Sequence, residues 1–202
     1  LKYDKALDWT NYPLGVVWAF IEKGYPVDCG FDMLLFGNIP NGSGLSSSAS
    51  VEVVTGVALR DLFGYDDISM IDIALFGQYS ENNFNGVNCG IMDQFASVFG
   101  KAGNLIRLDC STMEYEYIPF DPQGYKLVLI DSVTKHELVD SPYNKRRQSC
   151  ERAAAAIAGN HPEVKLLGDA TLEMLEEVKD KISEEDYMRA TYAIQENSRL
   201  AD

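Results

Sequence analysis

The chain has 202 residues, of which 46% are hydrophobic and 24% charged, and its formal net charge is −14. This composition is ordinary for a globular protein, and the length allows one large or two small domains. The excess of acid argues against nucleic acid and against anionic membrane surfaces as partners, because binding either requires clustered Lys and Arg.

The cysteines and the chain ends also carry information. Cys29, Cys89, Cys110 and Cys150 form no CxxC pair, so neither a zinc site nor a disulfide framework is predicted. No apolar run reaches membrane-spanning length and no signal peptide is visible, so we expect a protein of the reducing cytoplasm. The chain opens at Leu1 rather than Met and ends at Asp202 inside a helical pattern, so we expect a piece of a longer protein.

The first half of the chain reads as helices around one strand. Apolar spacing predicts helices over residues 11–23, 51–62, 71–81 and 91–99. The apolar run 31–36 suits a buried strand, and the polar, Gly-containing stretch 82–90 suits a loop. Ser69 and Asp72 predict a capping box at the start of the third helix.

The second half reads as strands followed by helices. Strands are expected at 105–108, at 115–117 with one wet face, and at 126–130 in a central position. Helices are expected at 143–158, 171–181 and 184–200, and the acidic stretch 173–186 suits a solvated helix face. Together with the first half, this order predicts an α+β fold.

A Gly- and Ser-rich turn, Pro40–Ser50, lies between the predicted strand 31–36 and the helix after it. Gly42 and Gly44 let the backbone approach a ligand, and the free N–H groups of the helix start favour phosphate. The turn is not a Walker A loop, because Leu45 follows Gly44, and it lacks the third Gly of a Rossmann fingerprint. An ordinary turn with a capping residue is the alternative. Three hydroxyls at the helix start favour nucleotide phosphate: Ser46, Ser47 and Ser48.

Asp93 is the candidate catalytic residue. It stands near the start of the predicted helix 91–99, where the helix dipole favours an ionised carboxylate. Such a carboxylate can take the proton from a hydroxyl that attacks a γ-phosphate. Considered alone, an Asp in a first helical turn is more often merely stabilising.

Several segments resemble one family. Pro40–Ala49 matches the Pro-x-x-x-Gly-Leu-x-Ser-Ser-Ala motif of the GHMP kinases throughout, and Cys89–Phe95 resembles the catalytic segment in its galactokinase form. Tyr143–Arg147 and the stretch from Trp9 to Val16 are similar to further galactokinase segments. Asn88 is a departure, because galactokinases usually carry Pro there.

The resemblance implies a two-domain GHMP kinase fold with mixed sheets and helices and with the active site between the domains, incomplete here at both ends. Residues 1–112 would be part of the N-terminal ATP-binding domain, and residues 113–202 would begin the C-terminal domain. The family motifs expected before Leu1 and after Asp202 are absent, so we expect these 202 residues alone to be inactive.

The resemblance also implies residue roles. Asp93 would be the base facing the anomeric hydroxyl, and Ser48 and Glu81 would hold Mg2+, which prefers hard oxygen ligands. Residues implied to bind ATP are Trp9, Tyr12, Gly42, Gly44, Ser46, Ser47 and Ser48. Residues implied to bind the sugar are Gly90, Asp93 and Tyr143. From the residues alone, Trp9 and Tyr12 read as core aromatics rather than as an adenine wall.

The implied activity is ATP-dependent phosphorylation of galactose at its C1 hydroxyl, with Mg2+ as cofactor and a monomeric full-length protein. A related sugar kinase, such as an N-acetylgalactosamine kinase, is one alternative. A non-catalytic relative that binds galactose and ATP as a sensor is the other. The intact segment Ser46–Ala49 and the intact Asp93 favour an enzyme, because a sensor need not keep a base.

Overall fold

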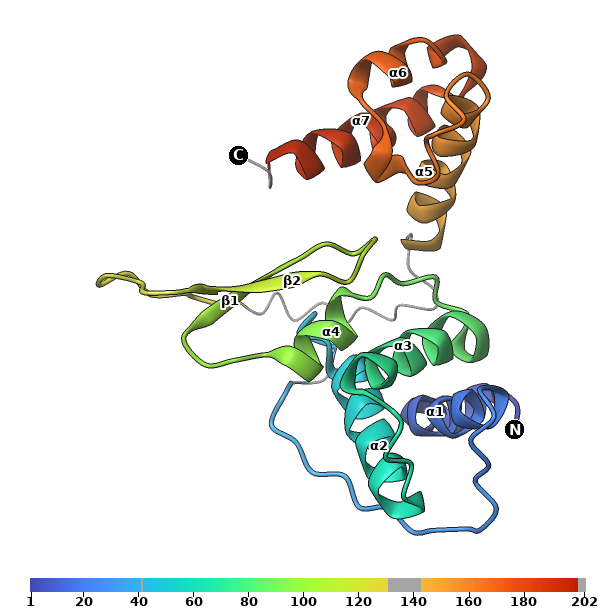
Figure 1. Ribbon diagram of the computed structural model, residues 1–202, viewed down its shortest axis with the longest axis vertical. Helices are drawn as coiled ribbons and strands as arrows, with labels where there is room; N and C mark the ends of the chain where they lie inside the picture. The colour runs from blue at the N-terminus through green and yellow to red at the C-terminus, as the bar shows by residue number, and fades with distance from the viewer. Residues whose placement is uncertain (41, 131–142, 200–202) are drawn as a thin grey trace. The chain divides into compact units, whose positions relative to one another are not determined.

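The structure is a computed structural model that describes residues 1–40, 42–130 and 143–199. Contacts divide the chain into two compact units, Leu1–Asp140 and Ser141–Asp202. Figure 1 draws them from blue at the N-terminus to red at the C-terminus. The predicted domain boundary between residues 112 and 113 stays a prediction. No helix within the described ranges is long and apolar enough to cross a membrane.

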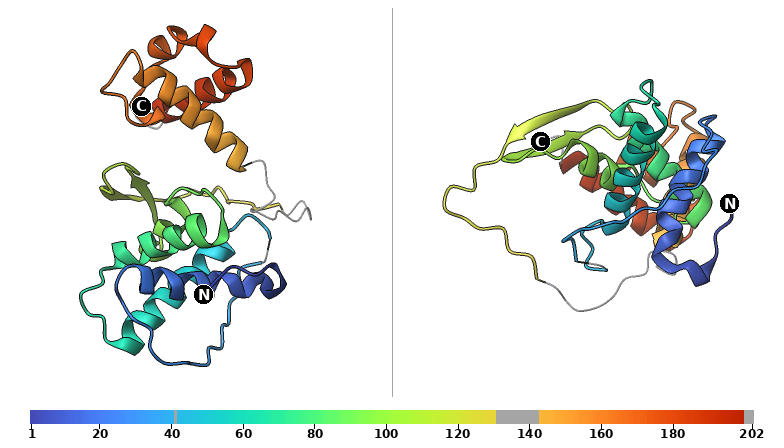
Figure 2. Two further views of the ribbon diagram at one scale, coloured as in Figure 1. Left: turned by 90° about the vertical axis from the view of Figure 1, so that its right-hand side faces the viewer. Right: turned by 90° about the horizontal axis from the view of Figure 1, so that it is seen from below.

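The first unit contains helices and one β-hairpin. Its helical elements, in chain order, are η1 (Lys5–Thr10), α1 (Asn11–Glu22), α2 (Ser47–Phe63), α3 (Met70–Ser80), the π-helical turn η2 (Glu81–Asn85) and α4 (Met92–Phe99). A hairpin follows, in which β1 (Asn104–Leu108) pairs antiparallel with β2 (Tyr115–Pro119). Helices α1, α2 and α3 pack against one another, and α4 packs on α2 and α3 (Figures 1 and 2).

The core of this unit lies between α1, α2 and α3. Val16 and Phe20 are buried on one face of α1, as the helical spacing predicts. Phe20 meets Phe76 of α3 edge to face, with ring centroids 5.2 Å apart. Leu59 of α2 is fully buried in the same cluster. The aromatic and aliphatic contacts therefore fix α1 and α3 on α2, the helix that follows the Gly- and Ser-rich turn.

The predicted capping box at the start of α3 is confirmed. The Ser69 hydroxyl accepts from the Asp72 N–H at 3.2 Å, and the Ser69 N–H donates to the Asp72 carboxylate at 2.9 Å. The other end of α3 runs directly into η2, so the stretch expected to be a loop over residues 82–90 begins with a π-helical turn. π-Helical turns often lie at functional sites.

Two predicted strands, 31–36 and 126–130, are wrong. Both runs are extended chain outside any sheet, and within the described residues the only strand pairing is β1 with β2. Leu34 is 96% and Phe36 98% exposed, and Ile130 is also almost fully exposed. An apolar run forms a strand only where another backbone supplies the hydrogen bonds and another surface covers its side chains.

The hairpin also differs in burial from the prediction. All five residues of β2 are exposed, so the expected contrast between a wet and a covered face is absent in this strand. Tyr115 and Tyr117 nevertheless make ring contacts, with centroids 5.5 Å apart. Tyr117 donates to the carbonyl oxygen of Phe99, which ties the hairpin to the end of α4.

The second unit is a small helical bundle. Its elements are α5 (Tyr143–Ala158), η3 (Leu167–Asp169), α6 (Leu172–Glu176), η4 (Lys179–Lys181) and α7 (Glu184–Arg199). Helices α5 and α7 pack together, and Arg152 of α5 donates two hydrogen bonds to the Asp186 carboxylate of α7. These helices confirm the predictions for 143–158 and for 184–199 of the last helix.

The helix predicted over residues 171–181 is broken. It forms as α6 and the short turn η4, because Val178 between them leaves helical geometry with φ −111° and ψ 8°. Leu175 and Val178 are both fully buried in the core of this unit. The burial of these two apolar side chains therefore determines the backbone path here, in place of a continuous helix.

Candidate functional site

The turn before α2 contains three residues with a left-handed backbone. Gly42 and Gly44 have φ values of 69° and 74°, a region that glycine occupies without strain. Ser46, the residue that precedes α2, also has a positive φ of 57°, and its side chain makes no capping hydrogen bond. A Cβ placed on Gly44 would meet nothing within 4 Å. Ser46 therefore does not act as an ordinary side-chain cap of α2. The free N–H groups at the start of α2 remain a suitable place for an anion.

A cluster of acidic side chains lies near the start of α2. Glu52, one helical turn after Ser48, shares its face of α2 and is fully buried. Glu81, the first residue of η2, is buried as well. Asp93, the second residue of α4, is half-buried and acts electrostatically on both glutamates. Three elements that are distant in sequence thus bring their carboxylates together.

The sequence analysis did not single out Glu52. One signal could have found it, because a Glu at the fourth position after Ser48 must lie on the same side of α2. That spacing says nothing about burial, however. Only the packing of α3 and α4 on α2 shows that the carboxylate is enclosed.

The surroundings raise the pKa of both buried glutamates, Glu52 and Glu81. Burial raises the pKa of Glu52 well above its usual range, and the neighbouring charge of Glu81 raises it further. Burial also raises the pKa of Glu81, against the Cys89 thiol and the Ser48 hydroxyl, which lie beside the carboxylate and favour its charged form. Removing carboxylates from water without a cation disfavours their charged state. The cluster is therefore suited to a positive charge.

Unpaired oxygen atoms mark where such a charge would act. Glu52 Oε1, Glu81 Oε1 and Gln94 Oε1 are buried and accept no hydrogen bond from the residues that the structure describes. Mg2+ is usually held by one or two carboxylates together with substrate phosphates and water. Ser48 and Glu81, the predicted ligands, are brought close to each other and offer hard oxygen atoms, so they fit this ion. No group of three or more His, Cys, Asp or Glu in the described ranges could by itself hold a metal ion.

Tyr12 faces the acid cluster. Its pKa is raised to about 12, first by burial and then by the charges of Glu81 and Glu52. Helix α1 therefore also contributes a side chain to the site. Tyr12 is half-buried, so the structure agrees with neither a purely core role nor a freely exposed ring.

Trp9 lies one turn earlier, on η1, and is 52% exposed. The buried amide of Asn11 holds this turn against α1 by donating to the carbonyl oxygens of Asp4 and Asp8 at 2.7 and 2.9 Å. An exposure of one half excludes the alternative that Trp9 is a core aromatic. Its role beside adenine stays a prediction.

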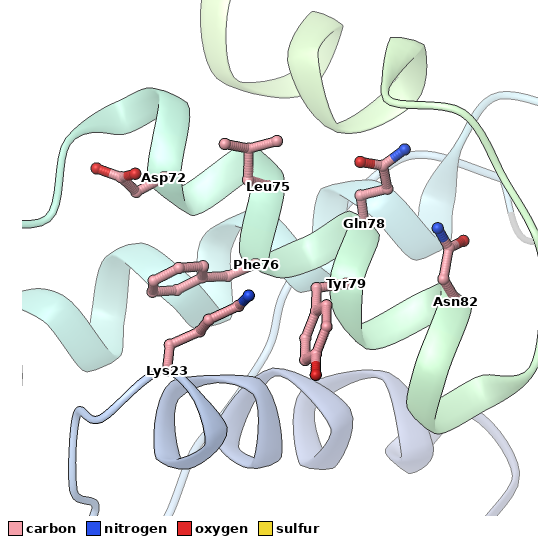
Figure 3. Close-up of a pocket in the computed structure, with 7 residues that line it drawn as sticks. All are labelled: Lys23, Asp72, Leu75, Phe76, Gln78, Tyr79 and Asn82. Carbon is pink, nitrogen blue, oxygen red and sulfur yellow. The ribbon is translucent and has the colours of Figure 1, made fainter. Parts of the chain in front are cut away.

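The segment before Asp93 is held from α3 and η2. The Gln78 amide donates to the Cys89 carbonyl oxygen at 3.3 Å, and the Cys89 thiol donates to the side chain of Asn82 at 3.4 Å. Gln78 and Asn82 also line a shallow hollow of about 350 Å³ along α3, which Lys23 closes from the end of α1 (Figure 3). None of the predicted site residues lines this hollow.

An aromatic stack beside the hollow was not foreseen from the sequence. Trp18 of α1 lies parallel to Tyr79 of α3, with ring centroids 5.3 Å apart, and the Lys23 amine lies 4.1 Å from the Tyr79 ring centroid. These contacts pin α1 to the end of α3, immediately before Glu81.

The predicted sugar contacts fall in different units. Gly90 is half-buried next to the start of α4, and a Cβ there would meet nothing within 4 Å, so the backbone is open to a ligand. Tyr143 begins α5 in the second unit. Its contact with a sugar at Asp93 stays a prediction.

Comparison with known proteins finds a matching family and similar proteins. Residues 11–101 match the family described as GHMP kinases N terminal domain. The chain is 49% identical over 200 residues to a galactokinase of Fusobacterium nucleatum, covering 98% of this chain and 51% of that protein. It is also 49% identical over 198 residues to a galactokinase of Clostridium beijerinckii, covering 98% of this chain and 50% of that protein.

The fold matches a solved structure of the same kind. The crystal structure of Lactococcus lactis galactokinase complexed with galactose superimposes with a TM-score of 0.82 at 35% identity, covering 96% of this chain and 50% of that one. The fold is thus the α+β fold of the GHMP kinases. The chain spans about half the length of the curated relatives it matches.

Proposed function

We propose that the protein containing this chain is a galactokinase, on the basis that residues 11–101 match the family described as GHMP kinases N terminal domain. It transfers the γ-phosphate of ATP to the C1 hydroxyl of galactose. The identity of about one half to galactokinases over nearly the whole chain supports this proposal. So does the likeness to a galactokinase whose structure holds galactose.

One observation carries the proposal: Ser48, Glu81 and Asp93 converge from α2, η2 and α4. Phosphoryl transfer depends on positioning and on charge stabilisation, with one group to receive the proton of the attacking hydroxyl. Asp93 takes that role, because it is half-buried at the N-terminal end of α4, where the helix dipole favours the carboxylate.

The remaining roles follow the surroundings of these residues. The turn at Gly42 and Gly44, with the hydroxyls of Ser46 and Ser47, holds the ATP phosphates at the start of α2. Ser48 and Glu81 hold Mg2+, which when bound neutralises charge on the phosphate oxygens. Residues proposed to contact adenine or the sugar are Trp9, Tyr12, Gly90 and Tyr143.

The proposal extends to cellular context. We propose a cytoplasmic, monomeric protein whose partners are galactose and ATP and which binds neither nucleic acid nor membrane. The net charge of −14 supports the expected lack of binding to nucleic acid and to anionic membranes, because their negative charge would repel the protein.

The test is ADP release by the full-length protein with galactose and Mg-ATP, comparing wild type with Asp93→Asn. The variant keeps the shape and loses the base, so turnover should fall about 10²–10⁴-fold with nucleotide affinity unchanged. Asp66→Asn, at an exposed turn of the same unit, is the matched control and should retain full turnover. Near wild-type turnover of Asp93→Asn would exclude Asp93 as the base.

The same assay separates the alternatives. Faster turnover with N-acetylgalactosamine than with galactose would identify a related sugar kinase. Binding of galactose and ATP by the wild-type protein without any turnover would identify a sensor.

A further inference from the structure

Gln94 connects the elements that carry the acid cluster. It follows Asp93 on α4 and is fully buried. Its Nε2 donates to Glu52 Oε2 of α2 at 3.0 Å and lies 3.5 Å from Glu81 Oε2 of η2, a longer and weaker contact. A Gln amide nitrogen carries two hydrogens, so it can serve both carboxylates at once. One amide thus bridges two acids that would otherwise repel each other.

Close packing fixes this bridge in place. A Cβ on Gly77 of α3 would lie 3.1 Å from Gln94 Cγ and 3.4 Å from Glu52 Cβ. The backbone of α3 at Gly77 therefore lies close to the stems of both side chains. This packing limits movement of the Gln94 and Glu52 stems toward α3.

The two carboxylate oxygen atoms of Glu81 have different surroundings. Gln94 occupies Oε2, while Oε1 accepts no hydrogen bond from the described residues. A carboxylate that binds a cation through one oxygen is typically oriented by a hydrogen bond to its other oxygen. Glu52 in turn holds the amide that does the orienting. Glu52 lies one helical turn further along α2 than Ser48. It is linked to Glu81 through the Gln94 amide that both carboxylates contact.

We propose that Gln94 and Glu52 are positioning residues that orient Glu81, through the Gln94 amide, so that its free oxygen holds a divalent cation with the nucleotide. This inference rests on the proposed function for the identity of the cation–nucleotide complex. It assigns Glu52 no direct contact with the cation and requires from it only a hydrogen-bond acceptor.

The experiment measures Mn2+ binding to the full-length protein in the presence of a non-hydrolysable ATP analogue, by electron paramagnetic resonance. Gln94→Met and Glu52→Met keep the side-chain volume and remove the donor or the acceptor, so Mn2+ affinity should fall about 10–100-fold. Glu52→Gln keeps an acceptor for Gln94 and should stay within about twofold of wild type, as expected if only the hydrogen bond matters. Thr55→Val is the matched control, because Thr55 is equally buried on α2, and its hydroxyl contacts the Val51 carbonyl oxygen at 2.7 Å and the Met33 sulfur at 4.0 Å rather than the acid cluster. It should leave Mn2+ affinity unchanged.

Unchanged Mn2+ affinity in folded Gln94→Met would overturn the proposal. So would a loss in Glu52→Gln equal to that in Glu52→Met, because the charge of Glu52 would then act directly. If Gln94→Met does not fold, Gln94→Asn replaces it, because the shorter amide cannot reach both carboxylates and the same loss is expected. A wild-type protein that binds Mn2+ and nucleotide without phosphorylating galactose would refute the proposed function alone, and the binding comparison would still decide the roles of Gln94 and Glu52.

Discussion

Gly15 of α1 lies close to Ser80 at the end of α3, and Gly15→Ala tests how tightly the site's helices are packed. A Cβ at this position would lie 2.2 Å from Ser80 Oγ, too close for a real contact, and 3.0 Å from Phe84 Cδ1, tighter than most real contacts. Overpacking of this kind costs about 1–3 kcal/mol, while replacing Gly by Ala inside a helix returns about 0.5–1 kcal/mol. We therefore expect a net loss of about 1–2 kcal/mol in the free energy of unfolding.

The cause of that loss can be isolated with Ser80. Its hydroxyl is buried and has no hydrogen-bond partner among the described residues, so Ser80→Ala alone should be close to neutral. Combined with Gly15→Ala, it removes the nearer clash and should recover at least about 0.5 kcal/mol of the loss. The Phe84 contact remains in the double variant, so recovery should be incomplete.

The assay is urea unfolding of the full-length protein, followed by far-ultraviolet circular dichroism for wild type, both single variants and the double variant. Gly30→Ala is the control, because a Cβ there meets nothing within 4 Å and stability should hardly change. If Gly15→Ala were as stable as wild type and Ser80→Ala showed no coupling to it, the inferred close approach of α1 and α3 would be wrong.

Three further predictions concern the site and the second unit. Ser48→Ala and Glu81→Gln should each raise the Mg2+ concentration needed for half-maximal turnover, because each removes an oxygen ligand, and unchanged Mg2+ curves would eliminate the metal role. Trp9→Leu should raise the KM for ATP with little change in melting temperature, because the ring is half-exposed, whereas a lower melting temperature with an unchanged KM would contradict an adenine contact. The Glu177 carboxylate raises the pKa of His161, so this pair stabilises the fold fully below about pH 6.5 and is lost as the pH rises through the raised value. The difference in melting temperature between wild type and His161→Gln should accordingly shrink between about pH 6 and pH 8, and a constant difference would exclude the ion pair as its source.

Local sequence determined the helices and the motifs that begin them. Helical hydrogen bonds join residues four apart, so the apolar spacing of α1, α2, α3 and α4 was readable without any knowledge of distant contacts. The capping box of Ser69 and Asp72 is equally local. The Gly- and Ser-rich turn and the segment around Asp93 were identifiable for the same reason, since the chemistry of each is contained in a few consecutive residues.

Tertiary structure decided what depends on distant partners. The apolar runs 31–36 and 126–130 have the composition of strands, but a strand needs a second backbone to bond with, and a local pattern cannot specify one. The predicted helix 171–181 broke at Val178, whose burial depends on the rest of the bundle. The sequence analysis did not assign Glu52 any role. Its enclosure with Glu81 and its bridge through Gln94 exist only because α3 and α4 close over it, since the burial of a charged group is a property of its neighbours rather than of its own segment.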